Sequence, residues 1–208
     1  MSYNFINRKL EEFNKYISNK KIAIIGIGVS NIPLLDYFHQ NNAKVTIFDR
    51  KTLDILDNKV VEKISKYNID YSLGENYLSK LSGFDIIFRS PSCRPDTKEL
   101  VEEAKHGAII TSEIEMLIKL CPGTVIGITG SDGKTTTTSL TYAILKEKGY
   151  DCYLGGNIGI PLFTKLNEMT PESIVVLELS SFQLMNMEIS PNISVINNIS
   201  PNHLDIHK

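Results

Sequence analysis

Residues 124–136 read Thr-Val-Ile-Gly-Ile-Thr-Gly-Ser-Asp-Gly-Lys-Thr-Thr, and this stretch says most about the fold. An apolar run leads into a turn that contains glycine, and Gly133-Lys134-Thr135 opens a helical segment. Strand, glycine turn and helix in this order are typical of a phosphate-binding loop, in which backbone N–H groups and a helix N-terminus surround phosphate oxygens. The stretch therefore predicts a nucleoside triphosphate site, with Lys134 at the outer phosphates and the Thr135 hydroxyl at Mg²⁺.

One position departs from the general phosphate-loop pattern. That pattern has a glycine five residues before Gly133, and this chain has Ile128 there. The alternative interpretation is an ordinary junction between a strand and a helix, with no ligand.

Composition limits the class of protein. The chain has 208 residues, 42% hydrophobic and 22% charged, with a formal net charge of −2. These values are ordinary for a soluble globular protein and do not favour binding to nucleic acid or to an anionic membrane. The three cysteines are widely spaced, no signal peptide is recognisable, and no apolar run reaches the ~18 residues of a membrane span. We therefore expect a cytoplasmic protein.

Strands and helices alternate along the whole chain. Strands are predicted at 22–25, 45–48, 85–88 and 108–110, with helices at 5–17, 32–41 and 97–105. A second unit follows, with helices at 113–120 and 135–148 and strands at 124–128, 174–177 and 193–196. This order predicts an α/β protein with parallel sheets, divided into residues 1–111 and 112–208. The second unit has few strands for a phosphate-loop domain, so we expect the chain to be part of a longer protein.

A second glycine turn lies near the N-terminus. Gly26-Ile27-Gly28-Val29-Ser30-Asn31 follows a strand, and Asp49 ends the next strand about twenty residues later. This spacing resembles a dinucleotide fingerprint, but Asn31 stands where the third glycine belongs, which weakens the case for NAD. A tight turn without a ligand is the alternative.

Three polar residues are expected near the carboxyl ends of strands in the second unit. Glu178 ends the strand at 174–177, where a Mg²⁺ ligand is expected beside a phosphate loop. His203 follows the strand at 193–196, and Asn157 lies in the turn Gly155-Gly156-Asn157-Ile158-Gly159. Taken singly, each has a structural alternative: Glu178 as a cap, His203 as a packing residue and Asn157 in a flexible turn.

Four motifs taken together resemble the Mur ligases, the ATP-dependent amino-acid ligases of peptidoglycan assembly. They are Gly-Ser-Asp-Gly-Lys-Thr at 130–135, Gly-Gly-Asn-Ile-Gly at 155–159, Leu-Glu-Leu-Ser-Ser-Phe-Gln-Leu at 177–184 and Asn-Ile-Ser-Pro-Asn-His-Leu-Asp at 198–205. The family shares the departure seen at Ile128. Within the family, the resemblance is closest to the branch that adds D-glutamate to UDP-N-acetylmuramoyl-L-alanine.

The resemblance implies a Rossmann-like domain that binds the UDP substrate, followed by part of a central ATP-binding domain. The residues that would bind ATP are Gly130, Ser131, Asp132, Gly133, Lys134, Thr135 and Thr136. Those that would bind the UDP substrate are Gly28, Val29, Ser30, Asp49, Arg50, Ser90, Asn157 and Ser181. Lys134, Glu178 and His203 would be catalytic, and Thr135, Glu178 and His203 would bind Mg²⁺. Ser92 stands where the family usually has glycine, which would strain the loop if that backbone needs a positive φ.

The resemblance also implies a mechanism. A substrate carboxylate attacks the γ-phosphate of ATP, and the amine of D-glutamate displaces phosphate from the acyl phosphate. A modified lysine and a C-terminal domain of the family would lie beyond residue 208, so we expect little activity from this chain alone. The partners expected are small molecules, with no nucleic acid and no membrane, and the protein is expected to be a monomer. The alternatives are another Mur-type or folate-extending ligase, a regulatory nucleotide-binding module and an NAD-dependent oxidoreductase.

Overall fold

The computed structural model describes residues 5–185 and 187–201. It divides between Met116 and Leu117 into two compact units. The division falls inside helix α5 (Glu113–Leu120), so it lies a few residues after the predicted domain boundary at 111.

The first unit contains a five-stranded sheet in the order β3-β2-β1-β4-β5, and every pair of neighbouring strands is parallel. The strands are β1 (Lys21–Ile25), β2 (Lys44–Asp49), β3 (Asp70–Leu73), β4 (Ile86–Arg89) and β5 (Ile109–Thr111). The chain therefore winds outward in both directions from β1, and the order reverses between β1 and β4. In open α/β sheets the carboxyl ends of strands at such a reversal form the usual binding crevice.

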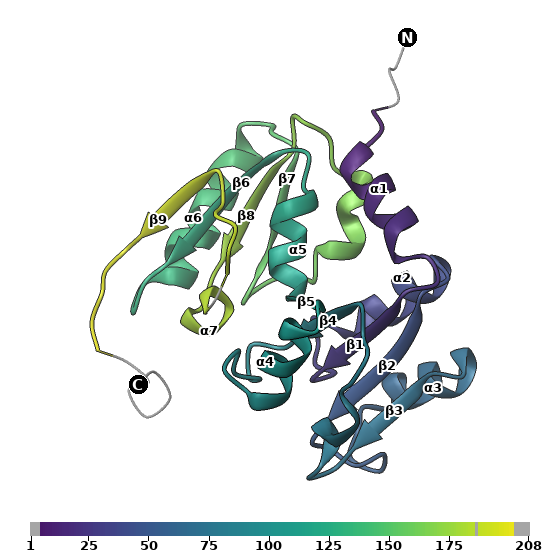
Figure 1. Ribbon diagram of the computed structural model, residues 1–208. Coiled ribbons are helices and arrows are strands. Elements are labelled where there is room, and N and C mark those ends of the chain that lie inside the picture. The colour runs from purple at the N-terminus through teal and green to yellow at the C-terminus, as the bar shows by residue number, and fades with distance from the viewer. Residues whose placement is uncertain (1–4, 186, 202–208) are drawn as a thin grey trace. The chain divides into compact units, whose positions relative to one another are not determined.

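Helices cover both faces of this sheet (Figure 1), and apolar side chains fill the space between them and the strands. The helices are α1 (Arg8–Ile17), α2 (Ile32–Gln40), α3 (Asn58–Tyr67) and α4 (Lys98–Lys105), with a short 3₁₀ helix η1 (Tyr77–Lys80). Ala23, Ile25 and Ile87 point to one face, where they form a core with Tyr77 and Leu100. The alternate residues face the other way, and Phe88 packs against Phe38 of α2 with ring centroids 5.1 Å apart.

The second unit contains a four-stranded parallel sheet in the order β7-β8-β6-β9. The strands are β6 (Thr124–Thr129), β7 (Cys152–Gly156), β8 (Ile174–Glu178) and β9 (Ile193–Ile196). β6 and β8 are largely buried, as their apolar sequences predict, whereas Ile193 and Ile196 of β9 are half exposed or more. With the sheet of the first unit, this confirms the predicted α/β class with parallel sheets.

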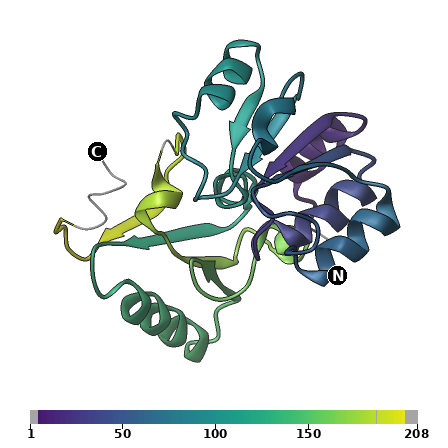
Figure 2. The ribbon, with the colours of Figure 1, turned by 90° about the horizontal axis from the view of Figure 1, so that it is seen from below.

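Helix α6 (Lys134–Glu147) follows the phosphate loop and packs across β6, β7 and β8 (Figure 2). Two shorter helical segments complete the unit, η2 (Phe163–Glu168) and α7 (Ser181–Leu184). The reversal of strand order falls between β6 and β9, so the loops after these two strands emerge side by side. Among the described residues, no helix is long and apolar enough to cross a membrane.

Candidate functional site

The phosphate loop begins later than the general pattern requires. Ile128 is still inside β6, where it pairs with Glu178 of β8 and is 1% exposed. The strand ends at Thr129, and the turn runs from Gly130 to Gly133 before α6. A glycine at 128 would have no function in a buried strand. The departure from the pattern is therefore explained by Ile128 lying inside the buried strand, with the turn starting two residues later at Gly130.

Lys134 begins α6, and its side chain lies back over the loop. The Nζ atom donates hydrogen bonds to the carbonyl oxygens of Gly130, at 2.7 Å, and Ser131, at 2.9 Å. The ammonium group is therefore held beside the N-terminus of the helix, where the helix dipole also favours an anion. This arrangement places two sources of positive potential at the same point of the sheet edge.

Thr135 follows this lysine directly, and its side chain meets that of Glu178. The Thr135 hydroxyl donates to Oε2 of Glu178 at 2.7 Å. The other carboxylate oxygen, Oε1, accepts from the side-chain amide of Asn157 at 2.9 Å. Glu178 is 1% exposed, so both hydrogen bonds compensate for the removal of its carboxylate from water. The structure thus joins three residues that the sequence had placed in three separate motifs.

Gly156 makes the contact between Asn157 and Glu178 possible. Its φ is +92°, and a Cβ atom at this position would lie 2.1 Å from the backbone oxygen of Glu178. That same oxygen accepts from the N–H of Asn157 at 2.8 Å. A side chain at 156 would therefore push β7 away from β8 where the Asn157 amide must reach the carboxylate.

Sequence reasoning assigned no role to two asparagines that follow β9. Asn197 and Asn198 hydrogen-bond to the phosphate loop and to Thr137 of α6. Their position depends on β6 and β9 being neighbours, which no local pattern in the sequence indicates. Asn198 is the first residue of one of the four motifs, and this was the only feature of the sequence that pointed to a role for it.

In the first unit, the turn after β1 is fixed by two side chains. The amide of Asn31, which is 3% exposed, donates to the carbonyl oxygen of Gly26 at 2.8 Å. The Asp49 carboxylate accepts from the N–H of Ile27 and from the N–H of Lys51, both at 2.8 Å. Asn31 therefore closes the turn where the dinucleotide fingerprint has its third glycine. Gly28 and Val29 are left exposed at the tip, and Ser30 is half-buried.

The loop after β4 lies against this turn. The N–H of Ser90 donates to the carbonyl oxygen of Ile25 at 2.8 Å, and the hydroxyls of Ser90 and Ser92 are 2.8 Å apart. Gly26 has a φ of +77°, and a Cβ there would lie 2.3 Å from the Ser90 hydroxyl oxygen. Ser92 is not among the described residues with positive φ, so it replaces the family's glycine without that strain.

Arg50 and the buried face of the β4 loop complete this region. The guanidinium of Arg50 lies 6.0 Å from the ring centroid of Tyr77, and burial raises the pKa of the Tyr77 hydroxyl. The buried guanidinium of Arg89 donates to the carbonyl oxygen of Cys93 at 3.2 Å. Arg50 follows Asp49 directly at the carboxyl end of β2, which is the region where the sequence predicts a substrate contact.

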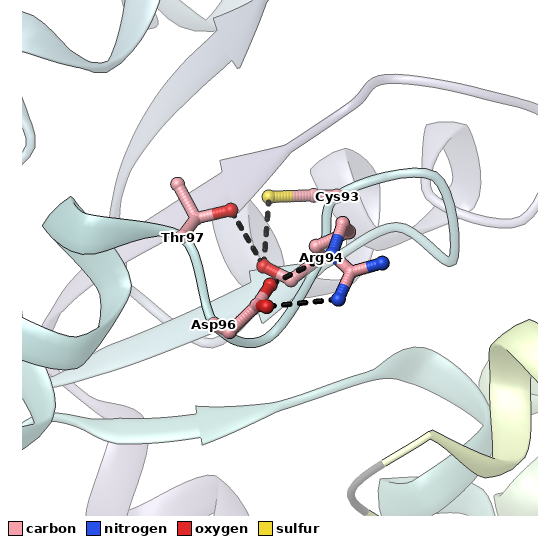
Figure 3. Close-up of polar contacts among 4 residues, drawn as sticks. All are labelled: Cys93, Arg94, Asp96 and Thr97. Carbon is pink, nitrogen blue, oxygen red and sulfur yellow. Dashed lines mark hydrogen bonds and ion pairs between the residues drawn. The ribbon is translucent and has the colours of Figure 1, made fainter. Parts of the chain in front are cut away.

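The same loop closes on itself just before α4 (Figure 3). Arg94 donates from Nε and Nη2 to the two carboxylate oxygens of Asp96, each at 2.8 Å, and the Thr97 hydroxyl donates to the Arg94 carbonyl at 2.6 Å. Cys93 is buried, and burial raises the pKa of its thiol. A buried thiol with a raised pKa is a weak nucleophile, so Cys93 has the properties of a structural cysteine.

Two predicted site residues, Ser181 and His203, belong to the C-terminal part of the chain. Ser181 is the exposed first residue of α7, and Ser180 caps that helix by accepting from the N–H of Gln183 at 3.3 Å. His203 lies outside the described residues. Among those that are described, no group of three or more His, Cys, Asp and Glu side chains is arranged to hold a metal ion.

Two models of one family match this chain in succession. Residues 20–112 match the Mur ligase MurD-like N-terminal domain, and residues 128–208 match the Mur ligase middle domain. The chain belongs to the Mur ligase family. The matched ranges correspond to the Rossmann-like sheet and to the sheet with the phosphate loop.

Relatives with high identity carry a single name. The UDP-N-acetylmuramoylalanine–D-glutamate ligases of Clostridium acetobutylicum and Ruminiclostridium cellulolyticum are each 53% identical to this Mur ligase chain over 203 residues, or 98% of it. The chain spans 44% and 43% of their respective lengths. The UDP-N-acetylmuramate:L-alanyl-γ-D-glutamyl-meso-diaminopimelate ligase of Neisseria meningitides has a similar fold, with a TM-score of 0.52, 20% identity, and coverage of 92% of this chain and 64% of that one.

Proposed function

We propose that this chain forms the UDP-substrate unit and part of the ATP unit of a ligase that adds D-glutamate to UDP-N-acetylmuramoyl-L-alanine. The observation that carries the proposal is the cluster of Lys134, Thr135 and Glu178 at one sheet edge, in a chain 53% identical to ligases named for that reaction. The reaction is amide formation driven by ATP. The domains proposed are residues 1–111 for the UDP substrate and 112–208 for ATP.

The second unit suits ATP with Mg²⁺. Residues 130–136, a turn and a helix start, are proposed to bind the phosphates through the Lys134 ammonium and through the backbone N–H groups that are not already paired within the protein. The Thr135 hydroxyl and the Glu178 carboxylate are the hard oxygen ligands that Mg²⁺ prefers, and they already lie 2.7 Å apart. Mg²⁺ bound there would neutralise phosphate charge as the substrate carboxylate approaches. His203 is proposed as a further ligand and catalytic residue.

Within this site, each side chain has a separate task. Lys134 is proposed to exchange its two carbonyl partners for phosphate oxygens and to stabilise charge on the transferred group. Asn157 holds Glu178 in the orientation that leaves its carboxylate facing Thr135, and is also proposed to contact the muramoyl substrate. Ser181, exposed at the start of α7, is the second proposed contact with that substrate.

The first unit suits a nucleotide at the reversal of its strand order. Gly28, Val29 and Ser30 at the tip of the first turn are proposed to bind the UDP phosphates through backbone groups. Asp49, Arg50 and Ser90 are proposed to contact the uridine. The Asp49 carboxylate has one hydrogen bond on each oxygen in the structure and keeps a lone pair on each for a ligand.

The test is Lys134→Ala in the intact protein, with Lys146→Ala on the exposed side of the same helix as the matched control. We expect Lys134→Ala to reduce D-glutamate-dependent ATP consumption by about 10²–10³-fold, because a charge that stabilises the transferred phosphoryl group is lost. Calorimetric binding of UDP-N-acetylmuramoyl-L-alanine should remain, and Lys146→Ala should behave as wild type.

Two results would contradict the proposal. The first is ATP consumption that does not depend on both D-glutamate and the UDP substrate. The second is binding of NAD without binding of UDP, since that would assign the first unit to an oxidoreductase.

A further inference from the structure

The segment that follows β9 runs alongside the phosphate loop. Thr129 pairs with Ile196 at the ends of β6 and β9, and the pairing continues past both strands. The N–H of Asn197 donates to the carbonyl oxygen of Thr129 at 3.0 Å, and the N–H of Ser131 donates to the carbonyl oxygen of Asn198 at 3.2 Å. The loop is therefore bordered by backbone on the side of β9.

Asn198 holds one residue of the loop from both sides of its backbone. Its Oδ1 accepts from the N–H of Asp132 at 2.9 Å, and its Nδ2 donates to the carbonyl oxygen of Asp132 at 3.1 Å. A side-chain amide has one acceptor and one donor side, so it can form this pair in only one orientation. The two hydrogen bonds together fix the direction of the peptides around Asp132.

Ser131 adds a second connection, through its side chain. Its hydroxyl donates to the carbonyl oxygen of Ser200 at 2.9 Å and accepts from the N–H of Ser200 at 2.8 Å. Asn197 contacts the helix as well as the loop: its Nδ2 donates to the Thr137 hydroxyl at 3.0 Å and to the carbonyl oxygen of Asp132 at 3.4 Å. Residues 197–200 thus contact both the loop and the first turn of α6.

These contacts decide which loop N–H groups face inward. The N–H of Ser131 donates to the backbone carbonyl of Asn198 and the N–H of Asp132 to its side-chain Oδ1, so neither N–H is presented to a ligand. We propose that Asn198 is a positioning residue for the ATP site, which turns these two peptides toward β9 and so leaves the phosphates to the N–H groups from Gly133 onward. This inference rests on the proposed function, because it assumes that the loop binds ATP.

A purely structural role makes a different prediction, and Asn192 provides the comparison. Its Oδ1 accepts from the N–H of Val125 at 2.8 Å, at the opposite end of β6. Asn192 and Asn198 are both exposed, and each lies beside β9 and holds a backbone N–H near one end of β6. If asparagine contacts of this kind only stabilise the sheet, removing either side chain should have the same consequences.

The experiment compares Asn198→Ala with Asn192→Ala in the intact protein. We measure KM for ATP, kcat, KM for the UDP substrate, and the melting temperature. Asn198→Ala should raise KM for ATP by about tenfold, as expected for the loss of a hydrogen-bonded pair that orients the loop. KM for the UDP substrate should stay within twofold in both variants, and Asn192→Ala should leave KM for ATP unchanged.

The variant Asn198→Asp tests whether the orientation of the loop needs both hydrogen bonds of the Asn198 amide or only the one that it accepts. The aspartate keeps an acceptor for the Asp132 N–H but places a second oxygen against the Asp132 carbonyl, where a donor is needed. The proposal therefore expects Asn198→Asp to raise KM for ATP at least as much as Asn198→Ala does. Wild-type KM for ATP in Asn198→Asp would contradict it, since one acceptor would then suffice.

Other outcomes also decide the matter. An unchanged KM for ATP in a folded Asn198→Ala variant would overturn this inference and leave the proposed function standing. An equal rise in Asn192→Ala would overturn it too, because both effects would then be structural. If an Asn198 variant melts below the assay temperature, ATP titrations at lower temperature give the same comparison. Failure of the wild-type protein to bind ATP would overturn the inference and the proposed function together.

Discussion

Glu178 is a buried carboxylate that depends on hydrogen bonds from its neighbours. It is 1% exposed, and hydrogen bonds from Thr135 and Asn157 occupy both of its carboxylate oxygens. If one donor is removed, a carboxylate oxygen of Glu178 is left buried without a hydrogen bond, and the folded state is destabilised by part of the desolvation free energy. The geometry of Gly156 controls one of those donors, because the backbone of Asn157 follows it directly.

The first prediction concerns Gly156. Gly156→Ala should lower the free energy of unfolding by about 3 kcal/mol or more, because it combines an unfavourable φ with a clash against the Glu178 backbone. The control is Gly149→Ala, whose φ is +84° but whose added Cβ would meet nothing within 4 Å. That control should cost only about 1 kcal/mol. Urea unfolding measures both, and equal costs would show that the contact with β8 is unimportant.

Single residues also show why family patterns need structural interpretation. Asn31 and Ile128 both replace pattern glycines, and both were correctly recognised as departures. Their reasons lie in the fold, since Asn31 closes the turn with its amide and Ile128 extends a buried strand. The sequence had no means of supplying these reasons, because each depends on a partner elsewhere in the chain.

At the level of elements, local patterns predicted most helices and strands to within a few residues. Helix α3 was missed, although Asp57 caps its start and Asn68 ends it in a left-handed conformation. Its buried residues, Val60 and Ile64, have the four-residue spacing of a helix, so the sequence contained a signal that the prediction did not use. Helix α7 was missed as well, because four residues are too few to show a period.

The second prediction concerns the link between β1 and β4. Asp85 accepts from the Lys20 ammonium and from the N–H of Lys21, each at 2.8 Å, and the hydrogen bond from Lys20 holds the pKa of Asp85 below its usual 3.8. A lowered folded-state pKa stabilises the protein above the unfolded value, and this contribution is lost as the pH falls through the folded value. Asp85→Asn should therefore cost about 1 kcal/mol at pH 7.

Urea unfolding at a series of pH values checks this. The difference between Asp85→Asn and wild type should shrink steadily below pH 3.8. Asp70→Asn, at an exposed aspartate that begins the edge strand β3, is the control and should show no comparable loss. A deficit that stays constant into strong acid would mean that the charge of Asp85 contributes nothing.

At the level of the whole molecule, the two units have separate sheets. The first unit has its own core, which includes Ala23, Ile25, Ile87 and Leu100 on one face of the sheet and Phe88 on the other. We expect residues 6–116 to fold alone and to melt in a single cooperative transition, because a domain of this size with a closed core is self-sufficient.

Thermal melting followed by circular dichroism tests this expectation. Phe88→Ala in the same fragment should lower the free energy of unfolding by about 3–5 kcal/mol, because Phe88 is fully buried. The exposed Tyr71→Ala is the control and should change it little. A broad transition without a folded baseline at low temperature would indicate that the first unit needs the second to fold.

The sequence by itself determined the α/β class, most of the elements, and the glycine turn at 130–133 between a strand and a helix. These follow from local spacing, which fixes whether a segment is a strand, a turn or a helix. Only the tertiary structure decided that Asn157 meets Glu178, 21 residues away, and that Asn198 meets Asp132, 66 residues away. Such contacts depend on the order of strands in the sheet, and β9 lies beside β6 because of packing over the whole unit.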